Sequence, residues 1–154
     1  MKMVNSYCRM GVMFCMTAML YGCNSYNVEP LPYDRGLVEV TVIENPKVKV
    51  TDFVDVMVDE FGARNIKVRC VPESYVQQPD EYVIKYDARQ SWDFSSYLSD
   101  ATIRISKDNF PVAKGKYHHV GQSCSFDLFT KWRGTEWKMK DLYDELLQNY
   151  PKRK

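Results

Sequence analysis

A chain of 154 residues that is 45% hydrophobic and 27% charged is long enough for one globular domain and too short for two. This composition excludes a disordered chain and a multi-pass membrane protein, and a formal charge of +1 excludes a strong basic footprint for nucleic acid. The nucleophile motif Gly-x-Ser-x-Gly and the Gly-rich phosphate-binding loops are absent from the sequence. Composition and motifs therefore assign no catalytic activity and no catalytic residues.

The amino-terminal segment has the layout of a signal peptide. Lys2 and Arg9 precede an apolar run from Met10 to Tyr21, and no acidic residue occurs before Glu29. The run is about a dozen residues long, whereas a membrane-spanning helix needs roughly 20. Residues 1–22 are therefore predicted to be a signal peptide rather than a permanent transmembrane helix.

The residues that follow the run, Leu20-Tyr21-Gly22-Cys23, resemble a bacterial lipobox. The resemblance implies cleavage between Gly22 and Cys23, a diacylglyceryl group on the Cys23 thiol and acylation of the new amino terminus. Two or three acyl chains form a durable anchor, whereas one binds a bilayer only marginally. Because Asn24 rather than Asp follows the cysteine, the expected location is the outer membrane, facing the periplasm. The alternative is an ordinary buried or free cysteine behind a chance apolar run.

Two cysteines, Cys70 and Cys124, remain in the mature domain, whose charge without residues 1–22 is −1. An exported compartment is oxidising, so a disulfide between them is predicted. Closing a loop of about 55 residues would stabilise the fold by roughly 4 kcal/mol. The alternative is two buried thiols that lie too far apart to join. The cysteine spacing does not fit a zinc site, so no metal or other cofactor is expected beyond the covalent lipid.

The first half of the mature chain predicts a tether followed by a strand, a helix and a second strand. Residues 23–36, with two prolines and no periodicity, are expected to form an extended, lipidated tether. The alternating segment 37–43 predicts a strand that ends in a turn. Thr51 is the candidate N-cap, and Asp52 an acid in the first turn, of a helix that ends at Gly62. Residues 66–71 predict a strand parallel to the first, joined by a right-handed crossover.

The second half predicts three antiparallel strands and a final helix. The alternating segments are 82–92, 97–106 and 110–120, and a short turn at 107–109 suits a hairpin. Residues 121–134 are irregular, with one helical turn around 126–132. Thr135 is the candidate cap of a helix that Pro151 terminates, and residues 151–154 are expected to be a solvated basic tail. Its apolar stripe comprises Met139, Leu142, Tyr143, Leu146, Leu147 and Tyr150.

These elements predict a single α+β domain over residues 37–150. Two helices pack on one mixed, mostly antiparallel sheet of about five strands, which makes a two-layer sandwich.

Two aromatic clusters are candidate binding surfaces. Trp92 and Asp93 stand where one predicted strand gives way to the next, and such a loop suits a binding lip for a peptide or sugar. The alternative is structural, with the tryptophan closing the sheet edge and the aspartate holding the turn. Trp132 and Trp137, interleaved with lysines, suit lipid headgroups or an anionic glycan. Their alternative is a core position for both rings beside an ordinary solvated lysine face.

His118 and His119 are the only histidines of the chain. Adjacent residues of a strand point to opposite faces, so these two side chains cannot chelate one metal ion together. They are interpreted as a solvated strand end. The alternative is that one of them acts alone with a carboxylate.

Several short motifs resemble a family of small bacterial lipoproteins of the Sbal type. They are the lipobox at Cys23, Tyr86-x-Ala88-x-x-Ser91-Trp92-Asp93, Tyr97 with Ala101, and Lys131-Trp132-x-x-Thr135-x-x-Lys138. The resemblance covers most of the mature domain. It implies a lipoprotein but no activity, because the family has no established catalytic residues.

The sequence thus favours a non-enzymatic, lipid-anchored envelope module that binds a protein or glycan partner and no nucleic acid. Exposed strand edges or the surface from Trp132 to Lys140 are the expected contact region. The alternative is an envelope hydrolase or small-ligand receptor that uses the Trp92–Asp93 loop with His118 or His119 nearby. A third possibility is a passive scaffold without a specific ligand.

Overall fold

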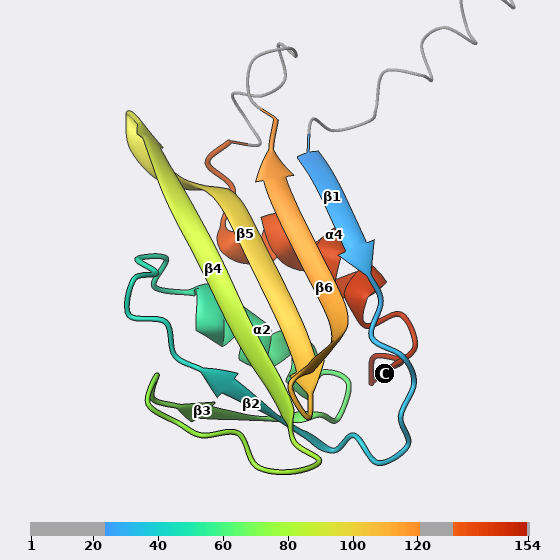
Figure 1. Ribbon diagram of the computed structural model, residues 1–154. Helices are drawn as coiled ribbons and strands as arrows, with labels where there is room; N and C mark the ends of the chain where they lie inside the picture. The colour runs from blue at the N-terminus through green and yellow to red at the C-terminus, as the bar shows by residue number, and fades with distance from the viewer. Residues whose placement is uncertain (1–23, 121–130, 154) are drawn as a thin grey trace, which may run out of the picture.

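The computed structural model describes residues 24–120 and 131–153. Within them, six strands form one sheet and two helices lie against one of its faces (Figure 1). The strands are β1 (Asn24–Glu29), β2 (Glu39–Ile43), β3 (Lys67–Val71), β4 (Tyr82–Asp93), β5 (Ser95–Lys107) and β6 (Phe110–His119), and the helices are α2 (Phe53–Gly62) and α4 (Thr135–Leu146). In these described ranges, no helix is both long enough and apolar enough to span a bilayer.

The sheet has the strand order β1-β6-β5-β4-β2-β3. β2 runs parallel to β3 and β4, and the other neighbouring strands are antiparallel. This confirms the predicted α+β sandwich with a mixed, mostly antiparallel sheet. The described sheet has one strand more than the five or so expected.

The additional strand is β1, and it corrects the prediction that residues 23–36 form an extended tether. All six residues of β1 pair antiparallel with β6. Tyr26 and Val28 pack against the core, and Leu31 is fully buried, with its backbone N–H donating a 2.8 Å hydrogen bond to the Leu146 carbonyl. The folded domain therefore already includes Asn24 and does not begin at residue 37.

The β2–α2–β3 unit follows the sequence prediction. β2 and β3 pair in parallel from Glu39↔Lys67 to Ile43↔Val71, and α2 connects them along the chain. The helix places its apolar positions on one side, where they are buried against the sheet. These residues are Phe53, Val56, Met57 and Phe61.

The three predicted antiparallel strands are confirmed as β4, β5 and β6. Asp108 and Asn109 both have positive φ, 50° and 66°, in the turn between β5 and β6, which is the geometry that two-residue hairpin loops require. Along β4, the side chains of Ile84 and Tyr86 are buried while those of Lys85 and Asp87 are exposed. One face of the sheet is therefore the core and the other faces solvent.

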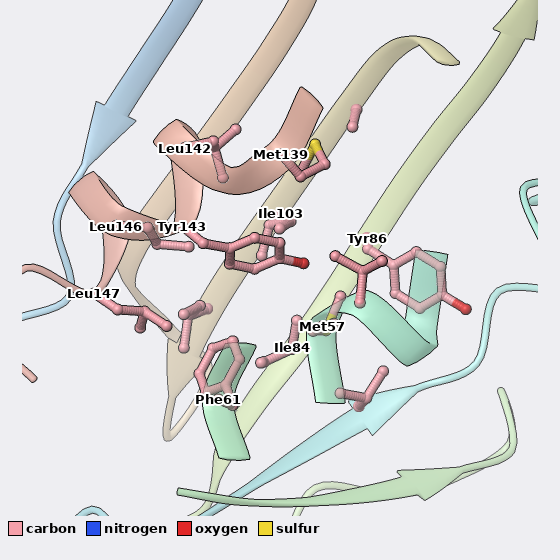
Figure 2. Packing of buried hydrophobic residues seen from close by; sticks show 14 of the residues in the cluster. Met57, Phe61, Ile84, Tyr86, Ile103, Met139, Leu142, Tyr143, Leu146 and Leu147 are labelled. Atoms are coloured by element: carbon pink, nitrogen blue, oxygen red, sulfur yellow. The ribbon is translucent and has the colours of Figure 1, made fainter. Parts of the chain in front are cut away.

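The core lies between the sheet and the two helices (Figure 2). The stripe predicted for the last helix is buried, including Leu147 and Tyr150, which follow the end of α4. The Tyr143 ring meets the Phe61 ring of α2 edge-on, with centroids 6.4 Å apart. This contact joins the two helices above the sheet.

The described residues of the carboxyl-terminal tail, 151–153, are exposed, and two of them also contact the helices. Lys152 forms ion pairs with Glu60 at 3.1 Å and with Asp144 at 2.9 Å. The backbone N–H of Arg153 donates a 2.7 Å hydrogen bond to the carbonyl of Ala63. Residues 152 and 153 are therefore held at the end of α2 by specific contacts.

Candidate functional site

The two aromatic clusters that the sequence singles out meet in the structure. At the end of β4, the Asp93 carboxylate forms an ion pair with Lys131, which precedes α4. The Trp132 indole N–H also donates a 3.2 Å hydrogen bond to the Asp93 carbonyl. We call Trp92, Asp93, Phe94, Lys131 and Trp132 the aromatic tip. It joins the β4–β5 hairpin to a segment nearly 40 residues further along the chain.

The large side chains of the aromatic tip face solvent. Trp92 is 75% exposed, Phe94 is 89% exposed and Trp132 is 42% exposed. Trp92 is therefore not buried in the core. Phe94 was not identified from the sequence, and it has a φ of 56°, in the left-handed region that bulky residues rarely adopt. An aromatic residue at the single turn position between two strands is the signal that would have found it.

Trp137 and Lys138 occupy different environments on α4. Trp137 is 40% exposed, and the Arg133 guanidinium lies 4.4 Å from its ring centroid. Lys138 is fully buried, which does not fit the solvated lysine face of the structural alternative. Its ammonium donates hydrogen bonds to the carbonyls of Leu98, at 3.0 Å, and Lys131, at 2.6 Å. Lys138 therefore ties α4 to β5 and to the segment that carries the aromatic tip.

The two histidines point to opposite faces of β6, as predicted. His118 is exposed, and its Nδ1 lies 2.6 Å from the Asp100 carboxylate of β5. Burial acts to raise the pKa of Asp100, but hydrogen bonds from His118 and Ser99 outweigh it and lower the pKa below its usual value. His119 is buried, with its ring edge-on to Tyr97 at 5.5 Å. Only His118 therefore fits the expected solvated strand end.

The predicted lipidation and disulfide sites are only partly covered by the structure. Gly22 and Cys23 lie outside the described residues, as does Cys124. Cys70 is an exposed thiol on β3, and its pKa is raised by burial and by the nearby charges of Glu44 and Asp55. The bridge between Cys70 and Cys124 stays a prediction. Residues 24–120 and 131–153 contain no group of three or more acidic, histidine or cysteine side chains arranged to hold a metal ion.

The helices cover one face of the sheet (Figure 1). The strand register and the exposure pattern place rows of charged residues on the other face. Lys85 pairs in register with Arg104, and Arg104 with Lys114. The next row brings Asp87, Thr102 and Lys116 together, and the third brings Arg89, Asp100 and His118 together. We call these nine residues the open face. It holds five basic residues, two acidic residues and one histidine.

Most cations of the open face lack an acidic partner. Arg104 forms an ion pair with Asp87 at 2.9 Å, and Asp100 is held by His118. Arg89 lies in register with Asp100 and its charge acts on that carboxylate. Among the described residues, the three lysines Lys85, Lys114 and Lys116 form no ion pair, and Lys114 lies in register with Glu29 of β1. The open face is therefore a net positive surface with cations available for an anionic partner.

A shallow pocket of about 520 Å³ opens on this face. Its charged lining consists of Lys47, Asp87, Arg89, Asp100, Arg104 and Lys116. The loop after β2 forms one wall, because the Asn45 side-chain amide donates hydrogen bonds to the Tyr86 carbonyl, at 2.9 Å, and to Asp87, at 3.1 Å. A polar, open pocket of this kind suits an anionic group of a larger partner better than an enclosed small molecule. The sequence did not single out this surface, although alternation along each strand placed its charges on one side.

No protein-family model matches the chain, and no curated protein matches it. Among solved structures, the PelC dodecamer from Paraburkholderia phytofirmans is similar, with a TM-score of 0.56 and 14% identity over 85% of this chain and 99% of that one. A dodecamer of a PelC point variant from the same organism has a TM-score of 0.54 and 13% identity over the same shares. At such low identity these likenesses show a shared fold.

A minor lipoprotein from Acinetobacter baumannii is a more distant structural neighbour. It shares 12% identity over 77% of this chain and 97% of its own, with a TM-score of 0.34. A value this low does not indicate a common fold.

Proposed function

We propose that the chain is a non-enzymatic, lipid-anchored module of the bacterial cell envelope that binds an anionic partner on its open face. The proposed location is the outer membrane, with the domain in the periplasm. The observation that carries the proposal is the open face itself, on which the three lysines Lys85, Lys114 and Lys116 of neighbouring strands form no ion pair. The lipobox-like residues Leu20–Cys23 support the anchor.

The open face has the properties of an interaction surface for a large partner. Its charges come from three neighbouring strands of a hydrogen-bonded sheet, so the protein holds them in place before binding. Its pocket is shallow and polar, which suits the carboxylates or phosphates of an envelope protein or glycan. Charge complementarity of this kind mainly provides specificity and speeds association.

The residues that the hydrolase alternative requires have other partners. Asp93 is paired with Lys131 and His118 is paired with Asp100, while His119 is buried beside Tyr97. These contacts favour structural roles for the groups in question. An envelope hydrolase activity that disappears in an Asp93→Asn variant with an intact fold would contradict the non-enzymatic proposal.

Crosslinking in intact cells tests the proposed surface. A photoreactive residue in place of Lys116, at the pocket, should give one discrete adduct with an envelope component. The same residue in place of the exposed Asp59 on α2 is the matched control and should not give that adduct. Equal labelling from both positions, or a mixture of adducts with many abundant envelope components, would contradict the proposal.

Charge reversal separates binding from a general effect of net charge. Lys116→Glu should weaken formation of the adduct when the photoreactive residue stands at Lys114. Lys67→Glu changes the charge by the same amount on the exposed edge strand β3 and should leave the adduct unchanged.

The similar PelC structures are dodecamers, so an adduct of twice the chain mass would identify a second copy as the partner.

A further inference from the structure

We propose that the aromatic tip lies in the headgroup region of the membrane to which Cys23 is anchored. This inference rests on the lipid anchor of the proposed function and adds the orientation of the domain. In this orientation the β4–β5 hairpin points into the lipid surface. The open face is then roughly perpendicular to the membrane plane and is exposed to the periplasm.

The anchor and the aromatic tip belong to the same end of the sheet. Asn24 is the first residue of β1, and one peptide bond, or about 3.8 Å between Cα atoms, separates it from Cys23. β1 pairs with β6 from Asn24 onward, so no flexible linker separates the sheet from the residue that follows the anchor. The acyl chains are therefore attached at the end of the sheet where β1 begins and β6 finishes.

The β4–β5 hairpin projects beyond this end. Ser25 pairs with His118, His118 with Asp100, and Asp100 with Arg89, so these four residues form one row across the sheet. From Arg89, β4 continues for four more residues, roughly 13 Å at the usual strand rise. In Figure 1 the hairpin and the start of β1 point to the same side of the molecule. A membrane that holds Cys23 is thus also within reach of the hairpin.

The chemistry of the tip suits a lipid headgroup layer. Trp92 and Phe94 are 75% and 89% exposed, and tryptophan favours the interface between water and hydrocarbon. Phe94 adopts a left-handed φ of 56°, which a glycine or asparagine would adopt with less strain. Because its ring contributes nothing to the core, packing within the domain does not account for this residue. Insertion into lipid gives the exposed ring an apolar environment.

The opposite end of the sheet has a different character. Asp80 and Asp108 lie together there, with the Asp80 backbone N–H 2.7 Å from the Asp108 carboxylate. Phe110 is the exposed ring at this end, and it begins β6 beside these acids. Acidic side chains are repelled by anionic lipid. Lys107 lies 4.0 Å from Asp80 and offsets part of this charge. The larger difference is apolar: three exposed aromatic rings at the tip, against Phe110 here, favour contact through the aromatic tip.

Fluorescence quenching by brominated lipid measures the depth of Trp92 directly. The full lipidated chain is placed in vesicles of phosphatidylethanolamine and phosphatidylglycerol with brominated acyl chains. Trp132→Phe and Trp137→Phe leave Trp92 as the only tryptophan of the three. The matched control adds Trp92→Phe and Phe110→Trp, since Phe110 is 73% exposed at the far end. Quenching of Trp92 should exceed that of the control by roughly twofold or more.

The outcomes separate this inference from the anchor. Chains that fail to float with the vesicles would contradict the lipid anchor of the proposed function. Chains that float but show equal quenching at both positions would overturn the membrane contact and leave the anchor intact. A photoreactive residue at Phe94 that captures a protein in cells, rather than lipid, would overturn it as well. If these double and quadruple variants misfold, Trp92→Phe alone in the wild-type chain should lower the quenched emission, and Trp132 of the same tip supplies the remainder.

Discussion

The hydroxyl of Thr135, the first residue of α4, donates a 2.8 Å hydrogen bond to the carboxylate of Asp52, which precedes α2. Thr135 was predicted to cap α4, and Asp52 was predicted to be an acid in the first turn of α2. In the structure neither forms a side-chain cap on its own helix, and Gly134 rather than Thr135 occupies the cap position of α4. The bond instead joins the amino-terminal ends of the two helices that cover the sheet.

Removal of the Thr135 hydroxyl should weaken the contact between the helices. Thr135 is buried, so Thr135→Val keeps the shape of the side chain and removes the donor to a charged acceptor. We expect the free energy of unfolding to fall by about 1–2 kcal/mol, measured by urea denaturation. Thr51→Val, at an exposed neighbouring position, is the control and should change it by less than about 0.5 kcal/mol. If the two substitutions had equal effects, the loss would come from replacing any threonine by valine and not from this hydrogen bond.

Most of the fold followed from hydrophobic periodicity, and β1 shows where that signal fails. Its sequence Asn-Ser-Tyr-Asn-Val-Glu has only two apolar residues and stands next to two prolines, so it looked like a linker. The alternation of Tyr26 and Val28 was the available signal. The strand exists because the exposed edge of β6 supplies hydrogen-bond partners, and such long-range pairing leaves little trace in the local sequence.

The candidate site was predictable only in part for a similar reason. Trp92, Asp93 and Trp132 were all identified, but nothing in the sequence placed the two clusters side by side. The structural alternative placed the lysines beside Trp132 and Trp137, Lys138 among them, on a solvated face. Lys138 is instead buried, and the Leu98 carbonyl, 40 residues away, accepts a hydrogen bond from its ammonium group. Contacts that pair a side chain with a distant backbone carbonyl have no sequence signature.

Gly115 should tolerate no side chain. A Cβ atom at this position of β6 would lie 2.8 Å from Leu142 Cδ2, and Leu142 is fully buried and cannot move aside. We expect Gly115→Ala to lower the free energy of unfolding by about 1–3 kcal/mol. At Gly62, the last residue of α2, an added Cβ has no neighbour within 4 Å, so Gly62→Ala should be neutral or stabilising. A Gly115→Ala variant as stable as wild type in thermal unfolding would contradict this packing.

Asp144 should make the stability of the domain sensitive to acid. Burial acts to raise its pKa, but hydrogen bonds from Lys152 and Lys140 outweigh this and lower the pKa to about 2. A carboxylate whose pKa is lowered by folding stabilises the fold above its ordinary pKa of 3.8, and this contribution disappears as the pH falls toward 2.

The Asp144→Asn variant tests this acid dependence. Thermal unfolding followed between pH 2 and pH 6 should show the variant less stable than wild type above about pH 4, with the difference shrinking below that. The difference should also be smaller in high salt, because Asp144 is partly exposed. Asp141→Asn, on the exposed side of the same helix, should show no such trend. A pH-independent difference for Asp144→Asn would point to packing rather than charge.

The predicted disulfide between Cys70 and Cys124 has a simple signature. Protein purified from the envelope should weigh less by two hydrogen atoms before reduction than after it. Cys70→Ser should then lower the free energy of unfolding by up to roughly 4 kcal/mol, since the long loop is no longer closed in the unfolded chain. An unchanged mass on reduction would show two separate thiols, with Cys70 as an exposed, weakly acidic one.

Cys23→Ser tests the anchor on which the membrane orientation depends. A serine hydroxyl cannot take the thioether-linked lipid, so the variant should accumulate as a precursor that retains residues 1–22 and carries no acyl mass. Intact mass spectrometry of the purified chain and flotation of cell membranes measure the two properties separately. Cys70→Ser is the matched control, because it removes one thiol outside the lipobox and should leave processing unchanged. A Cys23→Ser chain that is cleaved after Gly22 and still floats with membranes would show that residues other than Cys23 hold the domain there.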